Sequence, residues 1–292
     1  GSEMCIRDRD KFAAVSDLRK AIKRVKDWIS KYQPQRVEEI EIGISEWNIK
    51  VNEDRDTAEL ISALWSALWI GVMFEEGVDF ANQWDLTTYT ERGGHSAFHI
   101  DEGNMSVLPK SQYWALWMWT NLMGREMLKS DLSGMKSVRS FVTRSDTGLQ
   151  IMLINTSETE EATIALKIKG AREVEGQLHT FSGAEYFWDI HARKPLWSRP
   201  PTVRKITFND SPKITLPKFS INVLELPWSK QGTSRQIPTT SAAKLSLQLS
   251  LPNRVPADRA IEAWVIASDP TAQLPYLQSI DTIQLSIDGP AI

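Results

Sequence analysis

The stretch Glu46–Asn48 places a carboxylate, an indole and an amide next to one another. A carboxylate can act as a nucleophile or an acid, an indole offers a flat face for stacking, and an amide both donates and accepts hydrogen bonds. These three side chains suit the handling of sugars. The preceding run Ile40–Ile44 is apolar at every second position, which predicts a β-strand. The candidate site residues are therefore expected at the end of a strand.

The elements around this strand alternate between helix and strand. Apolar residues recur every three or four positions over Ser16–Tyr32, which predicts an amphipathic helix before the strand Val37–Ser45. The next helix, Leu60–Phe74, is apolar almost all the way round and is expected to be buried, with a capping box at Asp56–Glu59 and Gly77 at its end. A membrane span is the alternative for this run, but the run is shorter than the ~20 apolar residues that a bilayer needs.

A second strand and a further helix follow. The strand is expected over Val78–Trp84, and a polar loop, Asp85–Asn104, comes after it. Long loops that follow strands are common places for function. Pro109 begins a tryptophan-rich helix through Leu128. This order of elements predicts an α/β fold with a parallel sheet.

After Gly134 the sequence changes to short alternating runs separated by turn residues, which predicts an antiparallel β-sandwich ending near Trp228. Residues 229–243 are rich in Ser, Thr and Gln and predict a linker. The last runs predict a partial β module over 244–292, because they are too few to form a complete one. The predicted strands are Ser137–Thr143, Leu149–Asn155, Ala162–Lys169, Val174–Phe181, Val203–Phe208, Phe219–Leu226, Lys244–Leu251, Ala260–Ser268 and Ile280–Asp288.

Composition and charge limit the classes of partner. The chain has 292 residues, of which 41% are hydrophobic, and it can form a substantial core. Its formal net charge of -3 gives no reason to expect nucleic acid or an anionic membrane as a partner. The single cysteine excludes an internal disulfide, and the four histidines show no metal-ligand spacing. Most of the 12 tryptophans are expected to pack in the core.

The first nine residues resemble translated adapter sequence and lack hydrophobic periodicity, so residues 1–9 are expected to be non-native. On that expectation the natural sequence continues upstream. No apolar signal-peptide core is visible, but an artefactual start makes that observation uninformative about localisation.

The run Ile44–Asn48 at a strand end resembles the nucleophile strand of retaining glycoside hydrolases built on a (β/α)8 barrel, most closely the α-L-arabinofuranosidase and β-xylosidase families. Later elements agree in order, with a last barrel strand at Val78–Trp84, a closing helix that contains Tyr113–Leu116, and a sandwich whose final strand lies within Ile214–Leu226. The resemblance covers about Ser16–Pro227.

The resemblance implies an α/β plus all-β fold. Residues 10–134 would be the C-terminal portion of a (β/α)8 catalytic barrel, and 135–228 an antiparallel β-sandwich. Only about two of the eight barrel strands are expected in the chain, against the ~250 residues of a typical barrel. The chain is therefore expected to be an N-terminally truncated fragment of a glycosidase and to be inactive alone.

The same resemblance implies roles for five residues. Glu46 takes the position of the catalytic nucleophile, which attacks the anomeric carbon. Trp47, Asn48, Gln83 and Trp84 are the candidate substrate-binding residues, although packing is an open alternative for both tryptophans and for Asn48.

A retaining mechanism needs a second carboxyl group about 5–5.5 Å from the nucleophile. In the resembling enzymes this acid/base residue lies on an earlier strand, so it is expected upstream of this chain. Within the chain the remaining candidates are Asn52-Glu53, which is better explained as a solvated loop, and Asp101 and Glu102 in the polar loop.

A different class of protein stays open: a non-catalytic carbohydrate-binding or cell-surface β-protein in which tryptophans bind glycan and Glu46 is structural. A lyase is a weaker alternative, since His95 and His99 are the nearest histidines for a base. The expected partner is a carbohydrate, without metal or cofactor. An extracellular or periplasmic location is favoured for a polysaccharide-degrading parent, and the sequence leaves the oligomeric state, the sugar and the linkage open.

Overall fold

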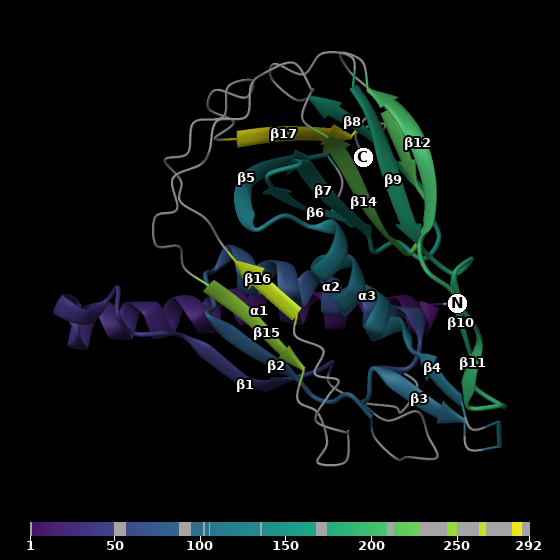
Figure 1. Cartoon of the computed structure of the whole chain (residues 1–292), viewed down its shortest axis with the longest axis horizontal. Coiled ribbons are helices and arrows are strands. Elements are labelled where there is room, and N and C mark those ends of the chain that lie inside the picture. The colour runs from purple at the N-terminus through teal and green to yellow at the C-terminus, as the bar shows by residue number, and fades with distance from the viewer. Residues whose placement is uncertain are drawn as a thin grey trace. The chain divides into compact units, whose positions relative to one another are not determined.

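The structure is a computed structural model of the whole chain (Figure 1). It describes residues 2–49, 57–87, 95–101, 103–104, 106–134, 136–167, 174–208, 213–227, 244–249, 263–266 and 282–287. Contacts divide the chain into two units, each made of three segments. Unit 1 comprises Gly1–Leu116, Tyr186–Ser198 and Lys244–Val265, and unit 2 comprises Trp117–Glu185, Arg199–Ala243 and Ile266–Ile292.

Unit 1 contains a four-stranded sheet in the order β1 (Gly43–Trp47), β2 (Phe80–Gln83), β15 (Lys244–Leu249) and β16 (Ala263–Ile266). Strands β1 and β15 both pair with β2 in parallel. The pairing of β1 with β2 confirms the predicted parallel sheet, whereas β15 was predicted in a separate β module. Within the described residues this sheet is open, and the assignment of its strands to the C-terminal portion of a (β/α)8 barrel stays a prediction.

The first strand begins later than the sequence predicts. Residues Pro34–Arg36 form a short 3-10 helix, η1, and a turn continues to residue 39, so β1 starts at Gly43 rather than Val37. Proline restricts the backbone before it and suits the first turn of a helix, which explains why the chain turns here instead of extending.

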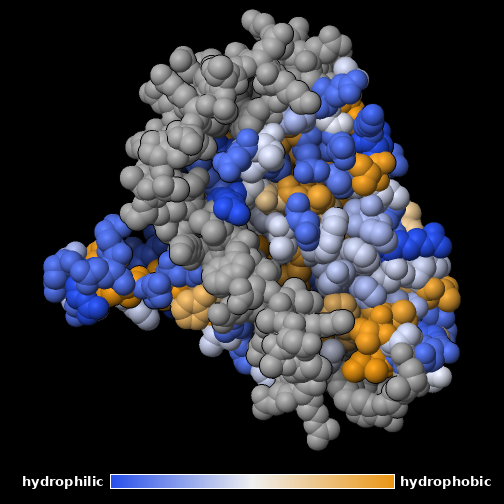
Figure 2. Space-filling model, viewed as in Figure 1, coloured by the Kyte–Doolittle hydropathy of each residue, from blue (hydrophilic) through white to orange (hydrophobic). Residues whose placement is uncertain are grey.

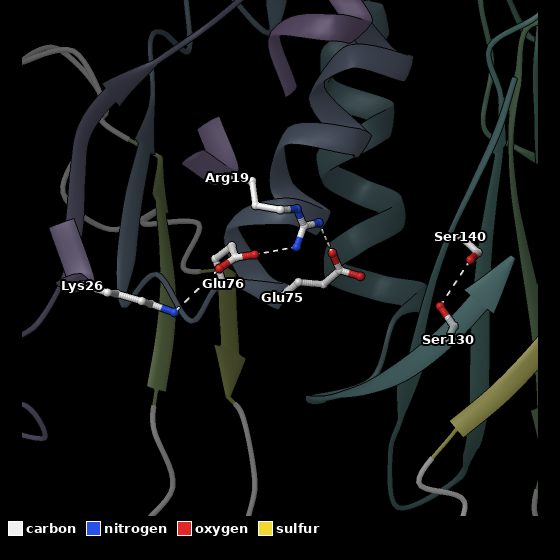
Figure 3. Close-up of polar contacts among 6 residues, drawn as sticks. All are labelled: Arg19, Lys26, Glu75, Glu76, Ser130 and Ser140. Carbon is white, nitrogen blue, oxygen red and sulfur yellow. Dashed lines mark hydrogen bonds and ion pairs between the residues drawn. The ribbon is translucent and has the colours of Figure 1, made fainter. Parts of the chain in front are cut away.

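Two helices of unit 1 are joined by ion pairs. Helix α1 (Ser2–Tyr32) is longer than the predicted Ser16–Tyr32, since it continues through N-terminal residues that have no hydrophobic period in the sequence. Helix α2 (Leu60–Glu75) is buried over most of its surface, as predicted. Arg19 of α1 bridges Glu75 and Glu76 at 2.5 Å each, and Lys26 lies 3.8 Å from Glu76 (Figure 3).

The capping prediction for α2 is only partly testable. Glu59 is the N-cap residue and its side chain makes no capping hydrogen bond, while Asp56 lies outside the described residues. At the other end Gly77 adopts a φ of +61°, and its amide donates to the Phe74 carbonyl, which confirms Gly77 as the end of the helix. Within the described part of the chain, no helix is long and apolar enough to cross a membrane.

The predicted polar loop contains structure that the sequence did not indicate. Strand β3 (Phe98–Asp101) pairs with β4 (Ser106–Pro109) in an antiparallel hairpin. A second hairpin, β10 (Tyr186–Asp189) with β11 (Lys194–Ser198), contacts it through β11. Both hairpins expose large apolar side chains, namely Ile100, Val107, Phe187 and Leu196. Figure 2 shows hydrophobic surface in orange at its lower right, where Figure 1 places these hairpins.

Helix α3 (Ser111–Leu122) ends earlier than the predicted Leu128. Gly124 follows its last turn, and the next residues enter a strand. A side chain at Gly124 would come within 2.2 Å of the Arg144 carbonyl oxygen, so the chain needs glycine where it approaches the neighbouring backbone.

Unit 2 is built on a nine-stranded sheet in the order β12-β9-β14-β7-β6-β5-β17-β8-β13. Its pairings are antiparallel except that of β17 with β5, which is parallel. The strands are β5 (Glu126–Ser133), β6 (Val138–Arg144), β7 (Gly148–Asn155), β8 (Ala162–Lys167), β9 (Val174–Phe181), β12 (Thr202–Phe208), β13 (Lys213–Leu216), β14 (Ser220–Pro227) and β17 (Thr282–Ile287).

One hydrophobic cluster forms the core of unit 2. It joins Ile164 of β8 and Ile214 of β13, at one end of the strand order, with Leu178 of β9 and Leu224 of β14, toward the other end. The sheet therefore curls so that both ends share a core. Ser130 and Ser140 connect β5 and β6 through a 3.2 Å hydrogen bond between their hydroxyls (Figure 3). The predicted antiparallel β fold is confirmed, whereas the division into two sheets of a sandwich stays a prediction.

The last three strands lie within those predicted for 244–292. Strand β15 joins the sheet of unit 1, and β17 joins the sheet of unit 2. The predicted linker, 229–243, lies outside the described residues, and the predicted domain boundaries stay predictions.

Candidate functional site

Glu46 lies in an irregular part of β1. Ile44 is opposite Ala81 and Trp47 is opposite Gln83, so three steps along β1 match two steps along β2. The extra residue makes a bulge that includes Ser45 and Glu46, and bulges change the direction of side chains at strand ends. Glu46 is exposed. Its carboxylate is thus accessible near the C-terminal end of a parallel strand.

Trp47 is a buried neighbour of that carboxylate. Its side chain is only 5% exposed, and its ring centroid lies 6.2 Å from that of Trp65. Trp65 in turn stacks on Trp69 at 4.5 Å. These contacts give Trp47 a packing role beneath β1, and its contact with a substrate stays a prediction.

Asn48 connects the ends of both strands. Its side-chain nitrogen donates to the carbonyl oxygens of Trp84 and His95, the latter at 2.7 Å. Its side-chain oxygen accepts from the Gln112 amide at 2.5 Å and from the Ile49 backbone at 2.7 Å. Four hydrogen bonds therefore fix this side chain in place.

Gln83 belongs to the same network. It is 1% exposed, and its amide nitrogen donates to the Gln112 oxygen at 3.0 Å. Gln112 thus donates to Asn48 and accepts from Gln83, which joins α3 to the ends of β1 and β2. The predicted binding of substrate by Asn48 and Gln83 stays a prediction, while their contacts with the protein suit them to hold the strand ends.

Trp84 differs from the other candidates because it is 51% exposed. It follows β2 directly, and its backbone amide donates to the Trp47 carbonyl at 2.9 Å. The peptide bond between Trp84 and Asp85 is cis. Glu46 and Trp84 therefore present accessible side chains from the ends of two adjacent strands.

Lys110 is a buried charged group near this network. It is fully buried just before α3, and its backbone amide donates to the Ala97 carbonyl at 2.8 Å. Burial lowers the pKa of its ammonium group to about 7, although the nearby Asp85 carboxylate acts in the opposite direction. Burial and the positive charge of Lys110 also lower the pKa of His99.

Asp101 is the one alternative acid/base candidate within the described residues. Its carboxylate accepts from Lys194 at 2.9 Å and from the Asn104 side chain at 3.0 Å. The Lys194 hydrogen bond is the main reason that its pKa falls to about 2. A carboxyl group that is ionised at neutral pH does not suit a general acid. Asn52-Glu53 and Glu102 lie outside the described residues.

Lys110 and Gln112 are not among the site residues that the sequence predicts. Both stand at the polar start of an otherwise apolar helix, and that position was the only available signal. Among the described residues, no group of three His, Cys, Asp or Glu side chains could hold a metal ion.

No family model and no curated protein matches the sequence. Several solved structures have a similar fold. The α-L-arabinofuranosidase from Thermotoga maritima in its arabinose complex is 16% identical, with a TM-score of 0.59 over 78% of this chain and 51% of that chain. The GH51 α-L-arabinofuranosidase from Thermotoga petrophila RKU-1 is 16% identical, with a TM-score of 0.56 over 73% of this chain and 48% of that chain.

The GH51 arabinofuranosidase from Xanthomonas axonopodis pv. citri is 15% identical, with a TM-score of 0.51 over 73% of this chain and 46% of that chain. This chain thus spans about half the length of these structures. The likeness concerns the fold: the protein shares part of the fold of glycoside hydrolases.

Proposed function

We propose that this chain is the C-terminal part of a retaining glycoside hydrolase in which Glu46 is the nucleophile. The observation that carries the proposal is the exposed Glu46 carboxylate, which lies in a bulge of β1 near the end of a parallel pair of strands. Catalytic carboxylates of barrel enzymes stand at such ends. The similar fold of the arabinofuranosidase structures supports the same conclusion.

In the proposed reaction, the Glu46 carboxylate attacks the anomeric carbon while a second carboxyl group gives its proton to the departing oxygen. The resulting glycosyl-enzyme ester is then hydrolysed by water, which the second group deprotonates. We propose that this acid/base residue comes from polypeptide upstream of the chain, so that the chain alone does not turn over substrate.

The neighbouring residues have separate proposed roles. Trp84, exposed at the end of the strand that pairs with β1, offers a ring for stacking on a sugar face. Asn48 and Gln83 hold the two strand ends through Gln112, and Trp47 packs beneath them. The proposed contacts of Asn48, Gln83 and Trp47 with the substrate lie at the ends of β1 and β2. An α-L-arabinofuranoside or a β-xyloside is the proposed substrate, within a plant or algal polysaccharide or oligosaccharide.

The test uses a protein extended upstream until it includes the remaining barrel strands. We expect the extended protein to release nitrophenol from nitrophenyl α-L-arabinofuranosides or nitrophenyl β-xylosides. The substitution Glu46→Gln should reduce kcat at least about a thousandfold, because it removes the nucleophile. A 2-fluoroglycoside that traps the covalent intermediate should label the peptide containing Glu46.

The matched control is Glu41→Gln, which removes another exposed carboxylate two residues before β1 and should leave kcat unchanged. Full activity in Glu46→Gln, or a label on another residue, would overturn the assignment. Glycan binding by the extended protein without any turnover would favour a non-catalytic carbohydrate-binding protein instead.

A further inference from the structure

The sheet of unit 2 carries a surface hollow that is lined by both polar and apolar residues and includes no residue of the Glu46 region. The cavity has a volume of about 370 Å³ and is lined by residues of β7, β9, β12 and β14. These strands lie side by side in the order β12-β9-β14-β7 (Figure 1). Small-molecule sites commonly have volumes of about 300–1,000 Å³, so the cavity is large enough for a small ligand.

Four polar side chains form a row across this cavity. Gln150 of β7 is opposite Glu225 of β14, Glu225 is opposite Gln177 of β9, and Gln177 is opposite Lys205 of β12. Directly opposed residues point to the same face of a sheet. The row therefore places four polar groups on one face, spaced by the ~4.8 Å between neighbouring strands.

The residues on either side of the row face the opposite way. Leu149, Leu178, Leu224 and Leu226 belong to the hydrophobic core cluster, and Ile206 packs against it. Because side chains alternate along a strand, the row lies on the face away from that core. The hydrophobic core of unit 2 thus packs against the opposite face of the sheet, directly behind the row.

Gln150 has an unmet hydrogen-bonding group. It is 5% exposed, and its amide nitrogen donates to the Ser145 hydroxyl at 2.9 Å. Its side-chain oxygen is buried and accepts no hydrogen bond from the residues that the structure describes. That oxygen has almost no exposed surface and lies next to Gly124, so Gln150 closes one side of the hollow, and Gln177, Lys205 and Glu225 are the accessible polar groups of the row.

The charges in the row limit the kind of ligand. Glu225 and the nearby Glu175 are acceptors, Lys205 is a donor, and the two amides are both. The positive charge of Lys205 disfavours binding of a metal cation, and the carboxylates of Glu175 and Glu225 disfavour binding of an anion. An apolar ligand would bury all of these groups without partners. A hydroxyl group both donates and accepts, so a ring with several hydroxyls can pair with Gln177, Lys205 and Glu225.

We propose that this cavity binds a short neutral saccharide. The site lies wholly within unit 2, is lined by Gln150 and binds through Gln177, Lys205 and Glu225. His179 holds Glu225 in place through a 2.6 Å contact between its ring nitrogen and the carboxylate. The proposal does not depend on Glu46, since a binding site on this sheet needs no nucleophile.

The test is titration of the isotope-labelled 292-residue chain with xylotriose, arabinotriose and cellotriose, followed by amide NMR and calorimetry. At least one trisaccharide should shift amides at 148–150, 175–177 and 225–227. The double substitution Gln177→Ala with Lys205→Ala should weaken that binding at least tenfold. Both residues are exposed, so the variant is expected to fold, and circular dichroism verifies this.

Two control variants show whether the binding depends on this cavity. Lys218→Ala removes an exposed lysine outside the cavity and should leave binding unchanged, as should Glu46→Gln. If Glu46 proves not to be a catalytic nucleophile, the results expected from these titrations stay the same. Three results would overturn the proposal. The first is the absence of amide shifts at about 10 mM saccharide, a concentration well above the ~1 mM Kd of weak binding. The others are shifts confined to residues near Trp84, and binding of zwitterionic L-glutamine in place of the saccharides.

Discussion

The fold strongly changes the acid–base chemistry of Lys110. A lysine normally titrates near pH 10.5, but burial at the start of α3 lowers its pKa to about 7. Between these two pH values the unfolded chain keeps a proton that the folded chain has lost. The free energy of unfolding therefore rises with pH across this window, and below pH 7 the penalty is constant.

The substitution Lys110→Met tests this linkage, because it keeps the length of the side chain and removes the titrating group. The wild-type free energy of unfolding should gain up to about 1.4 kcal/mol per pH unit relative to Lys110→Met between pH 7 and pH 10. Urea unfolding across this range measures the difference. Lys23→Met, which replaces an exposed lysine on α1, should follow the wild type. Parallel pH curves for Lys110→Met and the wild type would contradict the linkage.

The sequence predicted the position of Glu46 better than it predicted the surroundings. Alternating apolar residues were enough to place the carboxylate on a strand, and the strand was found. The network that fixes Asn48 depends on Gln112, which is 64 residues away in the sequence. A single sequence carries no signal for such a contact. The bulge at Ser45 and Glu46 depends on the register between β1 and β2, so it could not be predicted from the sequence either.

The end of α2 depends on the conformation of one glycine. Gly77 has a φ of +61°, and a side chain added there would meet nothing within 4 Å. Any cost of Gly77→Ala therefore comes from the left-handed backbone and not from a clash. We expect a loss of about 1 kcal/mol in the free energy of unfolding.

Gly183 provides the matched control, because a side chain there also meets nothing within 4 Å and its φ is outside the left-handed region. Gly183→Ala should change stability by less than about 0.5 kcal/mol. Thermal unfolding of both variants measures the contrast. Equal effects of the two substitutions would show that the backbone of Gly77 does not limit α2.

Helices and strands with a long hydrophobic pattern could be predicted from the sequence, whereas short elements could not. The apolar run of α2 and the alternating runs of β7 and β14 are long enough to identify from the sequence. The hairpin of β10 and β11 contains strands of four and five residues, too short to show a period. The start of β5 resembles the end of α3 in the sequence, since Met127 and Leu128 continue the apolar pattern of that helix.

The order of strands in each sheet depends on contacts between distant parts of the chain. Strand β14 lies between β7 and β9, and β17 lies between β5 and β8. Neither position follows from the order of the sequence, because alternation identifies a strand without identifying its neighbours. The architecture of each unit therefore needed the structure. The antiparallel strands predicted after residue 134 were found, but the sheet that they join already includes β5, which begins at Glu126.

The two units have separate buried residues, and this separation leads to a test of cooperativity. Leu64 in α2 belongs to unit 1, whereas Leu153 in β7 belongs to the core cluster of unit 2, and both are fully buried. Either Leu→Ala substitution should cost about 2–5 kcal/mol in its own unit. Leu64→Ala should accelerate amide hydrogen exchange in α2 and leave β7 and β14 protected, and Leu153→Ala should do the reverse. If each variant instead accelerates exchange in both units to the same extent, the chain unfolds as one cooperative body.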